Sequence, residues 1–291
     1  IFKQYVEEHS QGKIQVELFF FGSLGDETDT VQSVSMGILD MSMVGVANVV
    51  PYARELGVLT LPYIFDDVDD VIAATTGAPA ELLNSYAERA GFRVMAWTYT
   101  GFRNLSNSRH PVLKMSDLKG LKIRVPQNPV LLETYKAFGA TPVYMPWSLA
   151  FLGLKNGIVD GQCYGYIGFR AMKFLDANQK YITETHYTYP LQPVIMSTLV
   201  YRKFSHEEKE LLKAAGKAAQ EAALRYEIRE TDLAKLALLD SGAIISRLED
   251  EDDWKRTAIE RVWPKMIDYV GGRHALNAFL QACGKQPWKG K

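Results

Sequence analysis

The feature that most constrains the fold is one long helix predicted in the last third of the chain. Ser205 and Glu208 form a capping box, in which each side chain bonds the other residue's backbone N–H. Good helix formers continue from there to about Leu239, before Gly242. A helix of about 35 residues extends roughly 50 Å, which is longer than one lobe of a chain this size is wide. We therefore expect this helix to lie across two lobes, with any bend at Gly216.

Length and composition agree with two folded lobes. The chain has 291 residues, and single hydrophobic cores stop growing at about 250 to 300 residues. A content of 47% hydrophobic and 23% charged residues excludes a disordered chain. A formal charge of -1 excludes the basic excess typical of proteins that bind nucleic acids or anionic membranes. No apolar run approaches the roughly 18 residues that cross a bilayer, so we expect a soluble chain that is not inserted in a membrane.

The first part of the chain has the pattern of a strand, a loop, a helix and a second strand. Residues Lys13–Phe20 alternate like a strand, and Asp26 has the character of a helix N-cap. The helix is expected to stop at Gly37, and Ile38–Val46 is the next predicted strand. A unit this short predicts a right-handed βαβ crossover in a parallel sheet.

The same pattern returns later, with Thr141–Met145 as strand, Ser148–Lys155 as helix and Ile158–Tyr164 as strand. At the helix-to-strand junctions, Met36–Asp40 and Asn156–Asp160 are closely similar in sequence. One interpretation is that Gly-Ile-x-Asp is merely a common way to leave a helix. The other is that the chain holds two similar α/β lobes.

Further elements are predicted around these two units. The expected strands are 91–99, 121–125 and 193–201, and a short helical turn is expected at 117–120. A last helix is expected from about Asp253 to Tyr269, and Pro264 should kink or divide it.

Arg124 is the strongest candidate for ligand binding. In the strand 121–125, alternation places Leu121, Ile123 and Val125 on one face and Arg124 on the other, near the strand's carboxyl end. Open α/β sheets bind ligands at that end, and a guanidinium can hold a carboxylate through two parallel hydrogen bonds. The alternative is an ordinary ion pair. Arg103 follows another strand end and has the same two interpretations with weaker pattern support.

Aromatic residues gather at the same strand ends. Trp147 and Tyr164 are candidates for a ligand pocket because each lies where a strand of the second unit ends. Most of the others are expected in the core: Trp97, Tyr99, Phe102, Tyr144, Tyr166 and Phe169.

No catalytic or cofactor template was found in the sequence. The five histidines form no H-E-x-x-H pair, and the chain has no G-x-S-x-G, Walker loop or G-x-G-x-x-G motif. We therefore expect no enzymatic activity, no metal and no cofactor. Whether Cys163 and Cys283 form a disulfide is left open by the sequence.

The chain resembles the DctP-like extracytoplasmic solute-binding subunits of tripartite ATP-independent periplasmic (TRAP) transporters. The resemblance runs over nearly the whole chain, and the block around Arg124 is the most specific part. It is carried by Gln11–Ile14, Ser23–Asp26, Gly37–Asp40, Leu61–Tyr63, Gly101–Asn104, Asp117–Pro126 and Val159–Gln162.

The resemblance implies a two-lobed, periplasmic-binding-protein-like α/β fold with crossing strands and a long lobe-spanning helix. Lobe I would comprise residues 1–100 and 191–230, and lobe II residues 101–190 and 231–291. It implies a periplasmic protein whose partners are a small organic acid, a carboxylate or a sulfonate, and the TRAP membrane subunits. Relatives begin with a secretion signal and a first strand, so we expect that an N-terminal segment and one pocket wall are missing from this sequence.

The resemblance also implies a set of ligand-binding residues. Arg124 matches the arginine that holds the ligand carboxylate, and Arg103 a second, assisting arginine. Gln127 matches a polar residue after the strand, and Trp147 an aromatic wall. Opposite them, Glu27 matches an acidic position, and Met43, Val44 and Gly45 match a strand end that faces the ligand.

Tyr164 departs from the family pattern, because many relatives have asparagine at this position. Gly45 also stands where some binders of acid sugars have a carboxylate. The sequence therefore favours a smaller or flatter acid over a sugar acid. Two alternatives remain: a type-2 binding protein of an ABC transporter or sensor, and an enzyme that acts on a carboxylate.

Overall fold

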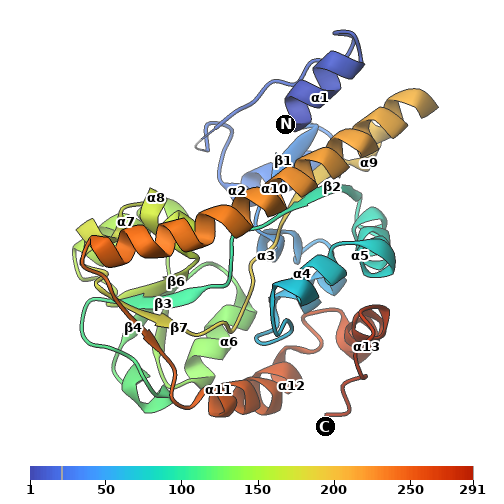
Figure 1. The fold of residues 1–291 in the computed structure, drawn as a ribbon. Coiled ribbons are helices and arrows are strands. Elements are labelled where there is room, and N and C mark those ends of the chain that lie inside the picture. Colours follow the sequence, from blue (N-terminus) through green and yellow to red (C-terminus); the bar gives the residue numbers. More distant parts are fainter. Residues whose placement is uncertain (21, 291) are drawn as a thin grey trace.

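A computed structural model describes residues 1–20 and 22–290 and shows a mixed α/β molecule with two sheets (Figure 1). The smaller sheet has the strand order β1-β8-β2 and the larger sheet the order β5-β4-β6-β3-β7-β9. The strands are β1 (Met41–Met43), β2 (Phe92–Thr98), β3 (Asn104–Asn107), β4 (Lys122–Val125), β5 (Thr141–Tyr144), β6 (Gly161–Tyr164), β7 (Tyr181–Glu184), β8 (Gln192–Ser197) and β9 (Ile244–Arg247).

Helices surround both sheets. The α-helices are α1 (Phe2–His9), α2 (Glu27–Ser35), α3 (Val46–Val49), α4 (Val68–Ala74), α5 (Gly77–Arg89), α6 (Pro129–Ala137), α7 (Trp147–Lys155), α8 (Tyr166–Ala171), α9 (Thr198–Tyr201), α10 (His206–Asp240), α11 (Glu251–Thr257), α12 (Trp263–Met266) and α13 (Gly272–Ala282). Short 3₁₀ turns form η1 (Arg54–Thr60), η2 (Met115–Leu118) and η3 (Phe174–Ala177), and a π turn forms η4 (Ala258–Val262).

The predicted long helix is confirmed as α10. Ser205 Oγ accepts from Glu208 N at 3.2 Å, and Ser205 N donates to Glu208 Oε2 at 2.7 Å, so the capping box is complete. The helix packs against β2 of the smaller sheet and against α8 beside the larger one, and it runs across both (Figure 1). Gly216 allows the helix to approach β2 closely, because a methyl group there would collide with the Met95 carbonyl oxygen.

The prediction of a first parallel unit was wrong. Residues 13–20 form no strand, and β1 pairs only with β8, in the antiparallel sense, within the part of the chain that the structure describes. Side chains take the place of a neighbouring strand here: Val16 N donates to Glu7 Oε1 at 3.0 Å, and Lys3 Nζ donates to Val16 O at 2.6 Å. Alternation of apolar and polar residues leads to a strand only where a neighbouring strand is available for hydrogen bonding.

The second unit agrees with its prediction. β4 pairs in parallel with β5 on one side and with β6 on the other, and α7 joins the two outer strands. The two similar junctions also share one geometry. Gly37 and Gly157 both have φ +68°, and the Ile38 and Ile158 N–H groups each donate at 2.9 Å to a carbonyl five residues earlier. The repeated sequence therefore corresponds to a repeated helix-to-strand structure.

The remaining predicted strands and turns are found within one to four residues of their expected bounds. The predicted strand 193–201 ends early, because its last residues form α9. The last helix is divided as expected: α11 passes through the π turn η4 into α12, which has Pro264 in its first turn.

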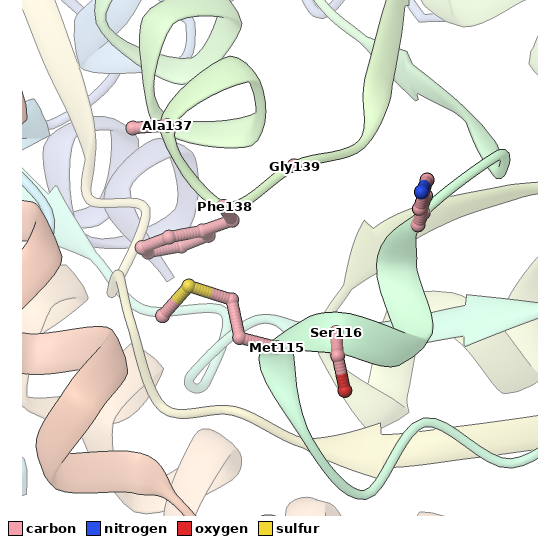
Figure 2. Close-up of a pocket in the computed structure, with 6 residues that line it drawn as sticks. Met115, Ser116, Ala137, Phe138 and Gly139 are labelled. Atoms are coloured by element: carbon pink, nitrogen blue, oxygen red, sulfur yellow. The ribbon is translucent and has the colours of Figure 1, made fainter.

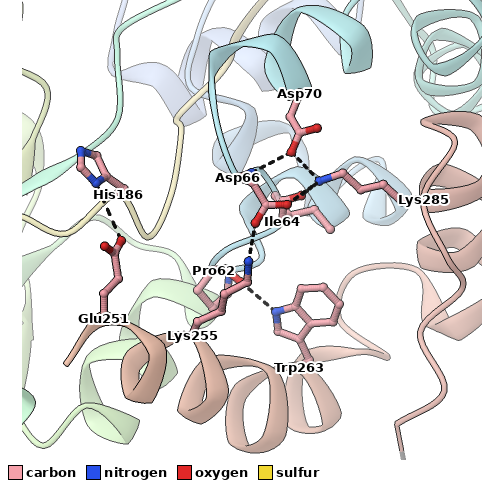
Figure 3. Close-up of polar contacts among 9 residues, drawn as sticks. All are labelled: Pro62, Ile64, Asp66, Asp70, His186, Glu251, Lys255, Trp263 and Lys285. Atoms are coloured by element: carbon pink, nitrogen blue, oxygen red, sulfur yellow. Dashed lines mark hydrogen bonds and ion pairs between the residues drawn. The ribbon is translucent and has the colours of Figure 1, made fainter.

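The C-terminal part of the chain, from α11 onward, is tied to α4 and to the loop before it by hydrogen bonds and ion pairs (Figure 3). Lys285 Nζ contacts Asp70 at 2.5 Å and Asp66 at 3.2 Å, and Lys255 also pairs with Asp66. Trp263 Nε1 donates to the Pro62 carbonyl at 2.9 Å.

The proposed division into lobes remains a prediction, but the packing departs from it at α13. This helix was assigned to lobe II, yet Leu276 and Phe279 belong to the same core cluster as Leu56 and Leu83 of the first hundred residues. The last part of the chain therefore packs on the smaller-sheet side of the molecule.

Two segments cross between the sheets, and a buried carboxyl group lies beside them. Thr100 Oγ1 donates to the Pro190 carbonyl at 2.9 Å, which joins the segments. Glu227 of α10 is 3% exposed, and its Oε1 lies close enough to Gly101 that a methyl group there would contact it. Thr231 donates to Oε1 at 3.0 Å, whereas Oε2 has no hydrogen-bond partner among the described residues. Burial raises the pKa of Glu227.

We expect Glu227→Gln to raise the free energy of unfolding at pH 7 by roughly 1 kcal/mol, because the substitution removes a buried charge that lacks a full set of partners. A carboxyl whose folded pKa is raised loses stability as the pH rises above the unfolded pKa. The difference between the variant and the wild type should therefore vanish below about pH 4. Urea unfolding across this pH range measures it.

The matched control is Glu221→Gln, an exposed position of the same helix whose ion pair with Arg225 is long, at 3.8 Å. This substitution should leave the free energy of unfolding unchanged, because exposed ion pairs usually contribute little to stability. Equal unfolding energies of wild type and Glu227→Gln at every pH would contradict the expectation.

Candidate functional site

Arg124 is a buried cation at the carboxyl end of β4. Arg124 is 3% exposed. Ile123 and Val125 point to the opposite face of the sheet, as the alternation predicted, and pack there in a hydrophobic core cluster. Arg124 Nε donates to the Met145 carbonyl at 2.8 Å, and the guanidinium lies 5.5 Å from the centre of the Trp147 ring. Among the described residues it has no ion pair.

Arg103 lies beside Arg124 and also lacks an ion pair among the residues described. Its Nη1 donates to the Cys163 carbonyl at 2.8 Å, and its guanidinium stands over the Tyr164 ring at 5.3 Å. Burial, and then the positive charge of Arg103, lower the pKa of Arg124 to about 10. Arg124 still carries its charge at neutral pH, so two cations share this region.

The two predicted aromatic residues meet beside these cations. The Trp147 and Tyr164 rings stack with centroids 4.6 Å apart at an interplanar angle of 24°. Gly168 of α8 packs so closely on the Tyr164 ring that a methyl group at Gly168 would overlap it. Burial raises the pKa of Tyr164, and Arg103 opposes this shift. No sequence pattern marks Gly168 as a residue that positions Tyr164.

The predicted residues of the first lobe lie around the start of α2 and α3. Glu27 accepts hydrogen bonds from Gly45 N at 3.0 Å and from Asn48 Nδ2 at 2.7 Å. Its negative charge raises the pKa values of Arg124 and Tyr164, so it lies close enough to interact with both. Val44 is fully buried and packs in the core, and Met43 is exposed.

Gln127 is exposed beyond the end of β4. The next residue, Asn128, is buried and caps α6 by accepting from Leu131 N at 2.9 Å, while its Nδ2 has no partner among the described residues. Thus Arg124, Arg103, Trp147 and Tyr164 form one cluster, and Glu27, which is bonded to Gly45, interacts electrostatically with it.

Two open hollows of the surface lie elsewhere. One, of about 490 Å³, is lined by Met115, Phe138 and their neighbours, and Figure 2 shows these two side chains facing each other. The other, of about 510 Å³, lies between Tyr52 and Gly272. Neither is lined by Arg124 or Arg103, whose guanidinium groups are instead covered by Trp147 and Tyr164.

Residues 1–20 and 22–290 contain neither a metal-binding cluster nor a membrane-spanning helix. No cluster of three or more histidine, cysteine, aspartate or glutamate side chains is placed to hold a metal ion there. None of the described helices combines the length and apolar character that a membrane crossing needs. Cys163 and Cys283 are free thiols, and Cys163 is buried next to the Tyr187 hydroxyl at 2.9 Å.

Comparison with known proteins gives a consistent result. The family described as bacterial extracellular solute-binding protein, family 7 (DctP), matches residues 1–268. The 2,3-diketo-L-gulonate-binding periplasmic protein YiaO of Escherichia coli is 32% identical over 222 residues, which cover 76% of this chain. The match covers 66% of YiaO, so the chain spans just under two thirds of that relative's length.

Two solved TRAP periplasmic solute-binding proteins have the same fold. The protein of Rhodobacter sphaeroides, in an open form without ligand, is 30% identical, with a TM-score of 0.83, and the match covers 97% of this chain and 92% of that one. The protein of Ralstonia eutropha H16, with bound (S)-2-acetolactate, is 27% identical, with a TM-score of 0.87 and coverage of 97% and 91%. The chain therefore belongs to the bacterial extracellular solute-binding protein family 7 and has the two-lobed α/β fold of TRAP solute-binding proteins.

Proposed function

We propose that this chain captures a small organic acid between its two lobes and delivers it, chemically unchanged, to the membrane subunits of a TRAP transporter. The observation that carries the proposal is the buried charge of Arg124, which forms no ion pair among the described residues. This cation is 3% exposed, has no ion pair among the described residues, and lies near a second cation, Arg103. Removing a charge from water is costly unless a counter-charge is supplied, and a ligand carboxylate supplies it.

The surrounding side chains fit a small acid. Arg124 anchors the carboxylate and Arg103 adds a second charge-assisted hydrogen bond. Trp147 and Tyr164 cover the apolar part of the ligand. Glu27 forms the opposite wall of the pocket together with Gly45, to which it is hydrogen-bonded. Val44 packs behind this wall in the core. Gln127 contacts the ligand at the end of β4.

The names of the relatives support this ligand class. YiaO is named for 2,3-diketo-L-gulonate, and the Ralstonia eutropha protein holds (S)-2-acetolactate. Both compounds are organic acids. Hydrogen bonds to charged groups contribute roughly 1.5 to 3 kcal/mol each, and micromolar affinity needs about 8 kcal/mol. Two or three such bonds, together with apolar contact, are sufficient without any covalent step.

The family places the protein outside the cytoplasm, and we propose the periplasm as its compartment. Its partners there would be two integral membrane subunits powered by an ion gradient. Closure of the lobes on the ligand would let these subunits distinguish loaded from empty protein, because the ligand binds the closed state better and shifts its population.

We expect Arg124→Met to remove acid binding without harming the fold. Wild-type protein should show a saturable rise in Tm with at least one acid from a panel of lactate, 2-acetolactate, D-erythronate and D-glucuronate. The variant should bind that acid at least about 100-fold more weakly, because two charge-assisted bonds are lost. Its unliganded Tm should be equal or higher, since an unpaired buried charge is replaced by an apolar chain. Calorimetry and thermal shift measure the two effects.

Arg247→Met is the matched control, because Arg247 lies on β9 of the same sheet and its side chain is 84% exposed. It should bind the acid like the wild type. Undiminished binding by Arg124→Met would refute the anchor, and conversion of the acid, followed by mass spectrometry, would identify an enzyme instead.

The aromatic wall gives a separate prediction. Gly168→Ala should weaken binding about tenfold, because the added methyl group displaces the Tyr164 ring from its stack on Trp147. In a Tyr164→Ala background the same change should have no effect on affinity, since the ring it would strike is gone. A penalty for Gly168→Ala that persists in both backgrounds would show that it acts on the fold and not through the aromatic wall.

A further inference from the structure

Three buried polar atoms without a partner gather beside Arg124. Gln162 is fully buried, and neither its Oε1 nor its Nε2 has a hydrogen-bond partner among the described residues. Asn104 is 3% exposed, and its Oδ1 is equally unpartnered there. Such atoms are rare in folded proteins, because each has lost its hydrogen bonds to water without gaining others.

The strand register places these atoms on the same face as the proposed anchor. Arg124 of β4 pairs with Gln162 of β6, and Tyr164 of β6 pairs with Asn104 of β3. Paired residues of neighbouring strands project from the same face, and the strands lie about 4.8 Å apart. Gln162 and Tyr164 also share a face, because they are two residues apart on one strand. The unpartnered atoms therefore lie next to the Arg124 and Tyr164 side chains.

A second glutamine on this side of the sheet shows that burial alone does not leave an amide unpaired. Gln179 is also fully buried, but its Oε1 accepts from Ser106 Oγ at 2.8 Å and its Nε2 donates to the Asp160 carbonyl at 3.2 Å. Ser106 is the other cross-strand neighbour of Gln162. The protein thus satisfies one amide internally and leaves the other, which lies beside the anchor, without a partner.

We infer that Gln162 and Asn104 form a second polar subsite, which binds a hydroxyl group of the acid whose carboxylate Arg124 holds. The inference rests on the proposed function and narrows its ligand class to hydroxy acids. The subsite is uncharged, and its buried unpartnered atoms are two acceptors, Gln162 Oε1 and Asn104 Oδ1, and one donor, Gln162 Nε2. A hydroxyl can donate to an acceptor and accept from the amide, whereas a ketone oxygen would leave both acceptors unpaired.

The distance between the subsite and the anchor limits where the hydroxyl can be. Neighbouring strands lie about 4.8 Å apart, so the side chains of Arg124 and Gln162 can contact groups separated by only a few bonds. We therefore place the hydroxyl on carbon 2 or carbon 3 of the acid.

Gln162→Met tests this inference, because methionine keeps the length of the side chain and removes its polar atoms. The probes are 2-hydroxybutanoate and 3-hydroxybutanoate, each compared with butanoate by calorimetry. Wild-type protein should bind one hydroxy acid at least about tenfold more tightly than butanoate. In Gln162→Met this preference should fall below about threefold. The Tm of the unliganded variant should be unchanged or higher, because an unsatisfied buried amide is removed.

Gln179→Met is the matched control. It should lower the Tm, since it breaks two hydrogen bonds, and it should keep the preference for the hydroxy acid. Asn104→Leu, which removes Oδ1 at nearly constant size, should reduce the preference in part and serves if Gln162→Met does not fold.

Two outcomes would overturn the inference alone: equal binding of hydroxylated and plain acids by the wild type, or a preference that Gln162→Met retains. Either would leave the proposed function standing, because acids would still bind through Arg124. Failure of every acid, in this set and in the earlier panel, to bind the wild type would overturn the proposed function and the subsite together.

Discussion

Arg124 carries a positive charge in the interior of the protein, and the residues around it compensate the burial only in part. Its partners within the described chain are neutral: the Met145 carbonyl oxygen and the face of Trp147. These contacts reduce the cost of burial but cannot cancel the charge, and Arg103 adds a second cation nearby. A sheet that holds a cation in this way is prepared for an anion, and its geometry need not change when the anion binds.

The parallel strands explain why these groups meet. β4, β5 and β6 end at one edge, so Arg124, the Met145 carbonyl and Tyr164 come together although they are far apart in sequence. The alternation along β4 separates two environments: Ile123 packs in a core cluster, and Arg124 faces the aromatic pair. A shift of the strand register by one residue would exchange the two environments. The packing of the hydrophobic core, which sets the register, therefore also sets the position of Arg124.

Local signals were enough to predict much of this arrangement. The capping box at Ser205 defined α10, and the alternation around Arg124 predicted its face correctly. Residues 13–20 were misjudged because alternation cannot tell whether a partner strand exists. Gln162 was missed as a site residue because a glutamine within a strand is unremarkable in sequence. Only the register and a full account of buried hydrogen bonds distinguish it from Gln179.

The same charge gives the proposed function a reason for closure to depend on the ligand. A ligand can shift a conformational equilibrium only by its difference in affinity for the two states. Trp147 and Tyr164 lie at the same sheet edge as Arg124, so they cover it in either state. In an open state water would still reach the guanidinium from the cleft, whereas closure of the other lobe would remove that water. An acid restores the lost interaction in surroundings of low dielectric, where charges attract more strongly. A neutral molecule of the same shape does not replace the lost interaction of Arg124 with water, so closure around it still has the free-energy cost of removing that water.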